Sequence, residues 1–484
     1  MVDLPFQSAT DLAEAIRRKT VGCSELLELY LDRIERFNPA INAVVVTDLP
    51  AARKRAAEAD AALARGKVWG PLHGVPMTVK EAYDVVDMPT TWGVPELKTN
   101  FPQRNAVVVE RLLNAGVTLF GKTNVPLLLG DWQTFNAIYG TTNNPWDLAR
   151  VPGGSSGGAA AALAAGLTGL EAGSDIGASI RIPAHYCGVW GHKPTYGVVP
   201  TRGQSLPGSY APSDLAVVGP MARSAHDLAI ALAAMAGADA IEGAAWRLDL
   251  PSPRKQRLSQ YRVALKLADP HFEVDHEIQH SLQTLAEFLA KAGVQVSDAA
   301  WPDIDTQQAR LIFLELFGAA TSSRKSPAAV AQAEAVVRDL APEDTSFAAC
   351  MARATVLSHR DWLATNQQRH RMRLQWAEFF RDYDVLLCPV AASAAYPHDQ
   401  GHAPDVRTLE VNGKREPFTD QLFWTGFAGL AYLPATVAPI GQTRGGLPIG
   451  VQIVGPQYGD LATIDFARHL EREFRAFVPP PGYA

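Results

Sequence analysis

A glycine- and serine-rich stretch from Pro152 to Thr195 constrains this chain more than any other segment. It begins with Gly-Gly-Ser-Ser-Gly-Gly at 153–158, continues as an alanine-rich run, and returns to Gly-Ser-Asp-Ile-Gly-Ala-Ser at 173–179. Glycine lets backbone approach backbone or ligand because it has no Cβ atom. The apolar run 159–167 favours a helix that is buried on all sides. The stretch is therefore typical of a buried site at which N–H groups and serine hydroxyls converge.

Composition adds few further constraints. The chain has 484 residues, of which 47% are hydrophobic and 19% charged, as in ordinary globular proteins. The net charge of −6 comes from scattered acids and bases, so no nucleic-acid partner is expected. The sequence has no apolar leader segment at its start and no apolar run of about 18 residues, which argues against secretion and against a membrane span. The four cysteines have no paired spacing, and we expect a cytoplasmic protein.

Strand and helix patterns alternate along the whole chain, which favours an α/β fold. Helices are predicted at 8–36, 50–65, 107–115, 225–236 and 275–292, with mostly helical structure over 300–430. Strands are predicted at 77–80, 117–120, 261–267, 293–296, 383–388 and 434–437. No repeat or low-complexity linker divides the sequence, so we expect one large domain over 1–484.

Residues 116–123 match the phosphate-binding pattern GxxxxGK[ST]. That loop needs a strand before its first glycine and a helix after its last residue. Here the helical pattern precedes Gly116, the strand pattern lies inside the motif, and Pro126 follows it closely. We expect an ordinary helix-glycine-strand unit rather than a P-loop enzyme.

Residues 276–280 match the zinc motif HExxH. At about 100° per residue, His276 and His280 share one helix face, and Ile278 and Leu282 lie on roughly the opposite one. Because the apolar face must be buried, the histidines should face solvent. No metal site is therefore expected.

Residues 153–157 also match the nucleophile elbow GxSxG, which follows a buried strand in Ser-His-Asp hydrolases. Pro152 stands directly before this turn and argues against a central strand there. His185 or His192 would be the base in such an enzyme, but both are more typical of core or rim residues.

A series of ordered motifs resembles the amidase signature family. Gly153–Gly158 and Gly173–Pro183 correspond to the two halves of its signature. Further matches are Gly74–Pro76, Val79–Glu81, Gly121–Pro126, Tyr139–Asp147, Lys193–Gly197, Asp384–Pro389 and Gly446–Gln452. The resemblance implies a mixed twisted β-sheet covered by helices on both sides. It places the core at about 65–225 and 380–470 and a variable substrate-pocket region at about 300–430.

The resemblance also implies a Ser-cisSer-Lys triad. Ser179 would be the nucleophile, Lys80 the base, and Ser155 the bridging serine after a cis peptide bond. A serine hydroxyl needs a base within hydrogen-bond reach, and lysine is a base only when burial lowers its pKa. A bridging hydroxyl can accept from one partner and donate to the other.

Other family positions carry over in the same way. The backbone N–H groups of Ile176, Gly177, Ala178 and Ser179 would form the oxyanion hole, and Ser156, Asp175, Arg181 and Gly154 would support the site. Two residues depart from the family pattern. Ala178 stands where glycine is usual, and only a negative φ would leave it free of strain. Glu81 stands where aspartate is usual.

The implied reaction is hydrolysis of a C–N acyl bond through an acyl-enzyme, without metal or cofactor. Amides are the default substrate, and esters and carbamates (urethanes) share the same tetrahedral geometry. The main alternative is the glutaminase (A-type) subunit of a tRNA-dependent amidotransferase, although Ser209–Ala216 departs from the segment usual in such proteins. A catalytically dead binding protein is a further alternative, which the intact triad residues argue against.

The substrate pocket is expected to be broad and apolar. Its predicted lining is Gly130, Asp131, Trp132, Gln133, Thr134 and Phe135, together with aromatic residues from the variable region: Phe313, Phe317, Trp362, Phe423, Trp424, Phe427 and Tyr432. Aromatic rings give stacking surfaces. We therefore predict a neutral, bulky small molecule, an aryl amide or aryl carbamate, bound by a monomer or homodimer.

Overall fold

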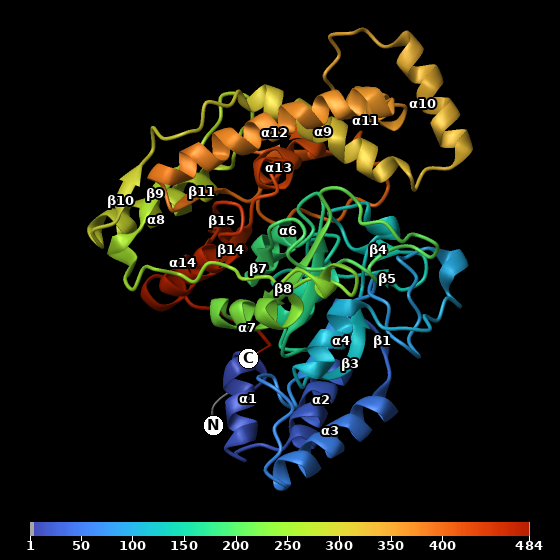
Figure 1. The fold of residues 1–484 in the computed structure, drawn as a ribbon, viewed down its shortest axis with the longest axis vertical. Coiled ribbons are helices and arrows are strands. Elements are labelled where there is room, and N and C mark those ends of the chain that lie inside the picture. The colour runs from blue at the N-terminus through green and yellow to red at the C-terminus, as the bar shows by residue number, and fades with distance from the viewer. Residues whose placement is uncertain (1–3, 484) are drawn as a thin grey trace.

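Two β-sheets organise the chain in the computed structural model, which describes residues 4–483 (Figure 1). The larger sheet has eight strands in the order β10-β9-β11-β15-β14-β7-β8-β6. Its strands are β6 (Glu171–Asp175), β7 (Trp190–Lys193), β8 (Val217–Ala222), β9 (Arg262–Leu265), β10 (Gln295–Ser297), β11 (Val385–Pro389), β14 (Ala435–Gln442) and β15 (Pro448–Val454). Strand β9 pairs in parallel with β10 and β11, and the other pairs are antiparallel. The predicted mixed sheet is confirmed.

The smaller sheet carries the lysine motif. It has the order β1-β3-β2, with β1 at Val44–Thr47, β2 at Pro76–Lys80 and β3 at Thr118–Thr123. Strands β2 and β3 are parallel, and all of their residues are buried. Two separate hairpins are formed by β4 (Phe135–Asn136) with β5 (Gly140–Thr141), and by β12 (Thr408–Val411) with β13 (Lys414–Pro417).

Helices cover both faces of the larger sheet. Successive residues of a strand point to opposite faces. On β14, Thr436 hydrogen-bonds Thr463 of α14 (Asp460–Glu473). The next residue, Val437, points to the other face. On the adjacent strand β15, a Cβ atom built on Gly450 would lie on that same face, 3.1 Å from a methyl of Val437 and 3.4 Å from the Cα atom of His185 in α6 (Arg181–Cys187). Helices α6 and α14 therefore pack on opposite faces, as predicted.

The remaining helices follow the predicted pattern closely. They are α1 (Ala9–Arg17), α2 (Cys23–Ile41), α3 (Leu49–Ala64), α4 (Val107–Asn114), α5 (Gly157–Ala164), α7 (Ala225–Met235), α8 (His276–Lys291), α9 (Thr306–Ser322), α10 (Pro327–Asp339), α11 (Phe347–Thr355), α12 (His359–Asp382) and α13 (Leu422–Leu430). Helices α9 to α12 form the upper layer in Figure 1, with α10 at its periphery. None of the helices in the described part of the chain is long and apolar enough to cross a membrane.

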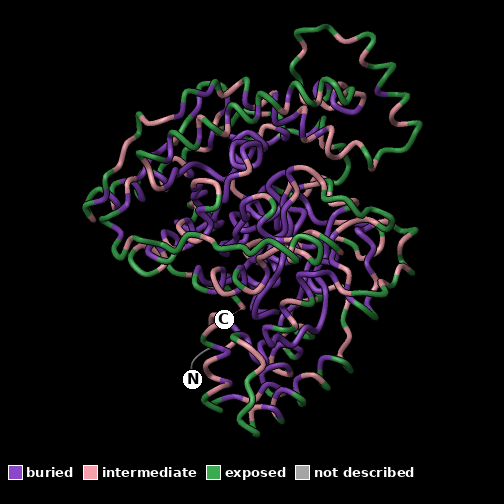
Figure 2. The backbone as a smooth tube through the Cα atoms, viewed as in Figure 1, coloured by how far each residue is buried: buried purple, intermediate pink, exposed green. Residues whose placement is uncertain are grey.

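Burial is deepest around the glycine- and serine-rich stretch. From 151 to 195 every residue is buried except Ile176, which is partly exposed, and the surrounding tube is correspondingly purple in Figure 2. Helix α5 is buried on all sides, as its uniformly apolar composition predicted. The two Gly/Ser turns at its ends therefore lie inside the protein.

Two of the three motif matches are settled by the fold. In the stretch 116–123, helix α4 precedes the motif and β3 begins inside it at Thr118, so the strand-loop-helix order of a P-loop is missing. Lys122 donates instead to Pro89 O at 2.6 Å and Thr90 Oγ1 at 2.8 Å. On α8, His276 and His280 are exposed while Ile278 and Leu282 are buried, which confirms the solvent-facing interpretation.

Candidate active site

Lys80 is the last residue of β2, and its side chain is completely buried. Its Nζ atom lies 2.6 Å from Ser155 Oγ, 3.0 Å from Ser156 Oγ and 3.0 Å from Ser174 Oγ. Within residues 4–483, no carboxylate forms an ion pair with this ammonium group. The base candidate therefore faces three hydroxyl groups.

Burial determines the protonation of Lys80. It lowers the pKa of the amine from 10.5 to about 7, against the opposing attraction of Asp175 and Glu171, and Arg324 lowers it further. A lysine with a pKa near 7 is partly neutral at physiological pH, so it can accept a proton.

The turn that carries Ser155 is held by close backbone contacts. The Gly154–Ser155 peptide bond is cis, as the resemblance implied. A Cβ atom on Gly154 would collide with the Asp131 carbonyl oxygen and lie 2.9 Å from the Gln133 carbonyl oxygen. Glycine is therefore required where the two chain segments meet.

Ser179 lies in the turn between β6 and α6 and is 5% exposed. It lines the same cavity as Ser155 and Ser174. No hydrogen bond joins its hydroxyl to Ser155 within the part of the chain that the structure describes. The structure thus brings Lys80 and Ser155 into contact and places Ser179 on the same wall.

The Ser179 turn is fixed by a buried ion pair. Arg181 donates to both oxygens of Asp175, at 2.8 and 3.0 Å, and also to Thr425 O and Gln452 Oε1. Burial opposes the charged carboxylate, but Arg181 holds the pKa of Asp175 below its ordinary value. Arg181 does not line the cavity, so it anchors the turn.

Ala178 carries backbone strain and corrects the predicted oxyanion hole. Its φ is +75°, in the left-handed region that favours glycine, so the turn carries backbone strain instead of the negative φ that would relieve it. Its N–H donates to Asp175 Oδ1 at 3.0 Å, which removes it from the free donors of the predicted oxyanion hole. The N–H groups of Ile176, Gly177 and Ser179 have no acceptor among residues 4–483.

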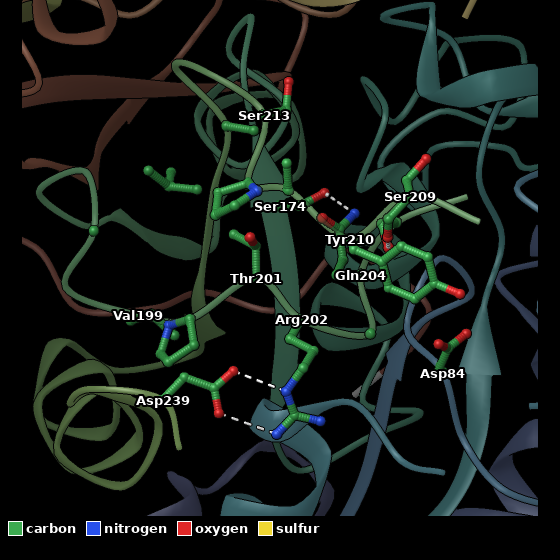
Figure 3. Close-up of a pocket in the computed structure, with 18 of the residues that line it drawn as sticks. Asp84, Ser174, Val199, Thr201, Arg202, Gln204, Ser209, Tyr210, Ser213 and Asp239 are labelled. Atoms are coloured by element: carbon green, nitrogen blue, oxygen red, sulfur yellow. Dashed lines mark hydrogen bonds and ion pairs between the residues drawn. The ribbon is translucent and has the colours of Figure 1, made fainter. Parts of the chain in front are cut away.

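A cavity of about 1570 Å³ opens over these groups (Figure 3). The part of its wall nearest to Lys80 contains Ser155, Ser174, Ile176 and Ser179. The remaining wall is formed mainly by residues 196–217 and 237–248, with Trp92, Leu129 and Arg324. Tyr210, Ile241 and Trp246 are strongly exposed at its rim, at 94%, 86% and 72%.

The predicted pocket segment 130–135 does not line this cavity. Instead, Trp132 Nε1 donates to Gly177 O at 2.8 Å, and Thr134 Oγ1 donates to Gly153 O at 2.9 Å. Asp131 pairs with Arg407 at 2.7 Å, and Gln133 bonds the Asp399 backbone. Gly130 and Phe135 belong to the same segment. Within this segment, Asp131 to Thr134 therefore contact the two Gly/Ser turns and hold them in place.

The predicted aromatic lining is also placed elsewhere. Phe313, Phe423, Trp424 and Phe427 are buried in the core, and neither Phe317, Trp362 nor Tyr432 lines the cavity. From the region 300–430, only 320, 323 and 324 reach the wall. Residues 196–217 and 237–248 could not be recognised as lining from the sequence, because long irregular segments carry no hydrophobic period.

The two histidines of the elbow alternative are core residues. His185 accepts from Gly450 N at 2.7 Å through Nδ1 and contacts Ser393 O at 3.2 Å through Nε2. His192 contacts Thr436 at 2.9 Å and Asp460 at 3.2 Å. Neither ring faces Ser155 or Ser179, so the Ser-His-Asp alternative is contradicted.

Glu81 has a structural task. Its carboxylate accepts from Thr91 N at 2.6 Å and from Trp92 N at 2.9 Å. Trp92 has φ of +54° and lies on the cavity wall. Glu81 therefore fixes a turn that presents an aromatic ring to the cavity.

Comparison with known proteins agrees with this geometry. A family model described as Amidase matches residues 25–464. An indoleacetamide hydrolase of Bradyrhizobium diazoefficiens is 32% identical over 473 residues, covering 96% of this chain and 86% of that protein. An acylamidase of Rhodococcus erythropolis is 34% identical over 479 residues, covering 97% and 96%. The A-type subunit of a glutamyl-tRNA(Gln) amidotransferase from Acidothermus cellulolyticus is 31% identical over 511 residues, covering 98% and 96%.

A solved structure of a bacterial aryl acylamidase of the amidase signature family superimposes with a TM-score of 0.79. It is 26% identical, and the match covers 97% of this chain and 96% of that one. The residues that the family model matches, 25–464, include both sheets and both Gly/Ser turns. The chain therefore belongs to the amidase family and is an amidase signature enzyme that hydrolyses amides.

Proposed function

We propose that the chain hydrolyses aryl amides through an acyl-enzyme on Ser179, with Lys80 as base and Ser155 as proton relay. The observation that carries this proposal is the fully buried Lys80 amine, which contacts three hydroxyl groups and, among the described residues, no carboxylate.

The hydrogen bonds around Lys80 support Ser155 as the relay. A neutral lysine has two N–H donors and one lone pair. Ser156 Oγ donates to the Ser174 carbonyl at 3.3 Å, so toward Lys80 it acts as an acceptor. Ser174 Oγ is also an acceptor, because Gln204 and Lys80 both donate to it. The lone pair is then left to the Ser155 hydroxyl at 2.6 Å.

The reaction follows from that arrangement of donors and acceptors. Ser155 gives its proton to Lys80 and takes the proton of Ser179, whose oxygen attacks the carbonyl carbon. The N–H groups of Ile176, Gly177 and Ser179, which have no acceptor within residues 4–483, would stabilise the oxyanion; each such donor contributes about 3 kcal/mol in other enzymes. The proton then returns through Ser155 to the leaving amine, and water releases the acyl group by the same path.

The cavity wall supports an aryl substrate. Trp92, Tyr196, Tyr210 and Trp246 supply rings, and Leu129 and Ile176 add apolar surface. We include aryl carbamates (urethanes) because an aniline leaves them through the same tetrahedral geometry. The substrate proposed is a neutral small molecule, bound by a monomer or homodimer.

The assay compares kcat/KM for acyl anilides, aryl carbamates, glutamine and malonamate-like acids. We expect the aryl amides to be preferred. Arg324 also lines the cavity and has no carboxylate partner within residues 4–483, so a preference for glutamine or another anionic amide is the outcome that contradicts the aryl proposal. That outcome would favour the amidotransferase alternative and leave the catalytic roles intact.

The catalytic roles have a separate test. Labelling by a fluorophosphonate probe should be abolished in Ser179→Ala, which removes the attacking oxygen. Retention of near-normal turnover in Ser179→Ala, with labelling lost in Ser155→Ala, would reverse the assignment of the two serines.

A further inference from the structure

Gln204 connects the cavity wall to the catalytic lysine. It lies in the segment 196–216, which follows β7 and forms much of the wall, and it is 8% exposed. Its Nε2 atom donates to Ser174 Oγ at 3.1 Å, the contact drawn in Figure 3. Ser174 Oγ is in turn 3.0 Å from Lys80 Nζ. One hydroxyl therefore separates Gln204 from the base.

This contact fixes how Ser174 can bond. A hydroxyl oxygen has two lone pairs and one hydrogen. Gln204 and Lys80 occupy both lone pairs, so the Ser174 hydrogen points toward neither of them. Without Gln204, that side of Ser174 would be open to water from the cavity, and its freed lone pair would leave it a stronger acceptor toward Lys80. Both changes would stabilise the charged form of Lys80 and leave less of the neutral amine that accepts the Ser155 proton.

We propose that Gln204 is a positioning residue, which holds Ser174 in place and keeps water away from Lys80, so that the amine stays neutral and accepts the proton of Ser155. This inference rests on the proposed roles of Lys80 and Ser155. Gln204 acts through Ser174 and touches none of the reacting atoms.

The charged groups that shift the pKa of Lys80 lie outside the Gln204 segment. Glu171 and Asp175 of β6 favour its charged form, and Arg324 at the end of α9 opposes it. Lys122 of the neighbouring β3 points away, to Pro89 O. Gln204 is uncharged, so its removal changes hydration and the Ser174 bond while these charges stay in place.

The experiment is the pH profile of kcat/KM from pH 5 to 10 for Gln204→Ala and Gln204→Glu, with an acyl anilide as substrate. In Gln204→Ala, water enters and Ser174 accepts more strongly from the charged lysine, so the acid limb should move up by about one pH unit. Activity should fall about fivefold at pH 7 and recover by pH 9. Gln204→Glu adds a negative charge and should move the limb further.

Ser205→Ala is the matched control. Ser205 is the next residue of the same segment, and its hydroxyl donates to Ser209 O at 3.0 Å, away from Lys80. Ser205 also lies on the cavity wall, so the comparison is of the midpoint of the acid limb, which should match that of the wild type, and not of the level of kcat/KM. Thermal unfolding of all variants checks that the fold is retained.

Two results would overturn the inference. A rate loss in Gln204→Ala that is equal at every pH would show a purely structural role, and an equal shift in Ser205→Ala would show general loosening of the segment. Failure of the proposed function is distinguishable, because Lys80→Ala would then keep the wild-type acid limb.

Discussion

Two buried lysines stand side by side in the smaller sheet and differ in what surrounds them. Lys80 ends β2, Lys122 lies in β3, and burial lowers both pKa values, to about 7 and about 8. Lys80 faces three hydroxyl groups beside a cavity. Lys122 donates to a carbonyl and a hydroxyl, and Glu81 and Asp84 favour its charge.

The difference shows that burial alone does not make a base. The Pro89 carbonyl oxygen can only accept, and the Thr90 hydroxyl donates its proton to Tyr83 O at 3.1 Å, so neither partner of Lys122 has a proton to give. Ser155 has one, and its other side opens to the cavity that contains Ser179. In the proposed mechanism the same desolvation thus serves proton transfer at Lys80, whereas at Lys122 it accompanies structural support.

The largest expected effect contrasts Lys80→Met with Lys122→Met. Lys80→Met removes the base and should lower kcat/KM by about 10³-fold or more. Lys122→Met leaves the Pro89 carbonyl without its donor and should cost about 2 kcal/mol of unfolding free energy. The Lys122→Met protein that remains folded, quantified by fluorophosphonate labelling, should keep the kcat/KM of the wild type. Equal loss of turnover in both variants would erase the distinction.

The pH dependence separates the two lysines next. Because burial lowers the pKa of Lys80 to about 7, the amine is neutral above that pH and charged below it. The kcat/KM should therefore fall about tenfold per pH unit below pH 7 and level off above it. Lys122→Met should show the same limb as the wild type. A shift of the acid limb of kcat/KM in Lys122→Met would contradict the assignment of Lys80 as the base.

A smaller effect comes from the hydroxyl partner of each lysine. Ser156→Ala removes an acceptor that orients Lys80 and should lower kcat about 10- to 100-fold. Thr90→Val removes a partner of Lys122 and should cost about 1 kcal/mol of stability with turnover unchanged within about twofold. Steady-state kinetics and urea unfolding of both variants give the comparison, and a turnover loss in Thr90→Val would weaken it.

The sequence was most informative where local pattern and chemistry coincide. The motif around Lys80, the two Gly/Ser turns and the buried α5 could all be predicted, because glycine, serine and an all-apolar run are themselves the structural signal. The contact of Gln204 with Ser174 could not, because it joins a loop without hydrophobic period to a strand 30 residues earlier. In a sequence, aromatic residues such as Phe313 and Phe423 look the same whether they lie in the core or line a pocket. Only their packing in the folded protein distinguishes these two positions.

The smallest effect concerns the turn beside each lysine. In both, a buried carboxylate accepts N–H groups of a turn that holds a non-glycine residue at positive φ: Asp175 with Ala178, and Glu81 with Trp92. The left-handed region costs alanine about 1 to 2 kcal/mol, and glycine loses about 0.5 to 1 kcal/mol more entropy on folding. Ala178→Gly should therefore stabilise the protein by about 0.5 kcal/mol in urea unfolding, with kcat/KM unchanged within about twofold. Trp92→Gly relieves the same strain but removes a ring that is only 3% exposed, which costs about 3 kcal/mol or more. The two turns should respond in opposite directions, because side-chain burial outweighs backbone strain only where a large ring is present. A loss of stability in Ala178→Gly would show that the Ala178 methyl contributes more to packing than its φ costs.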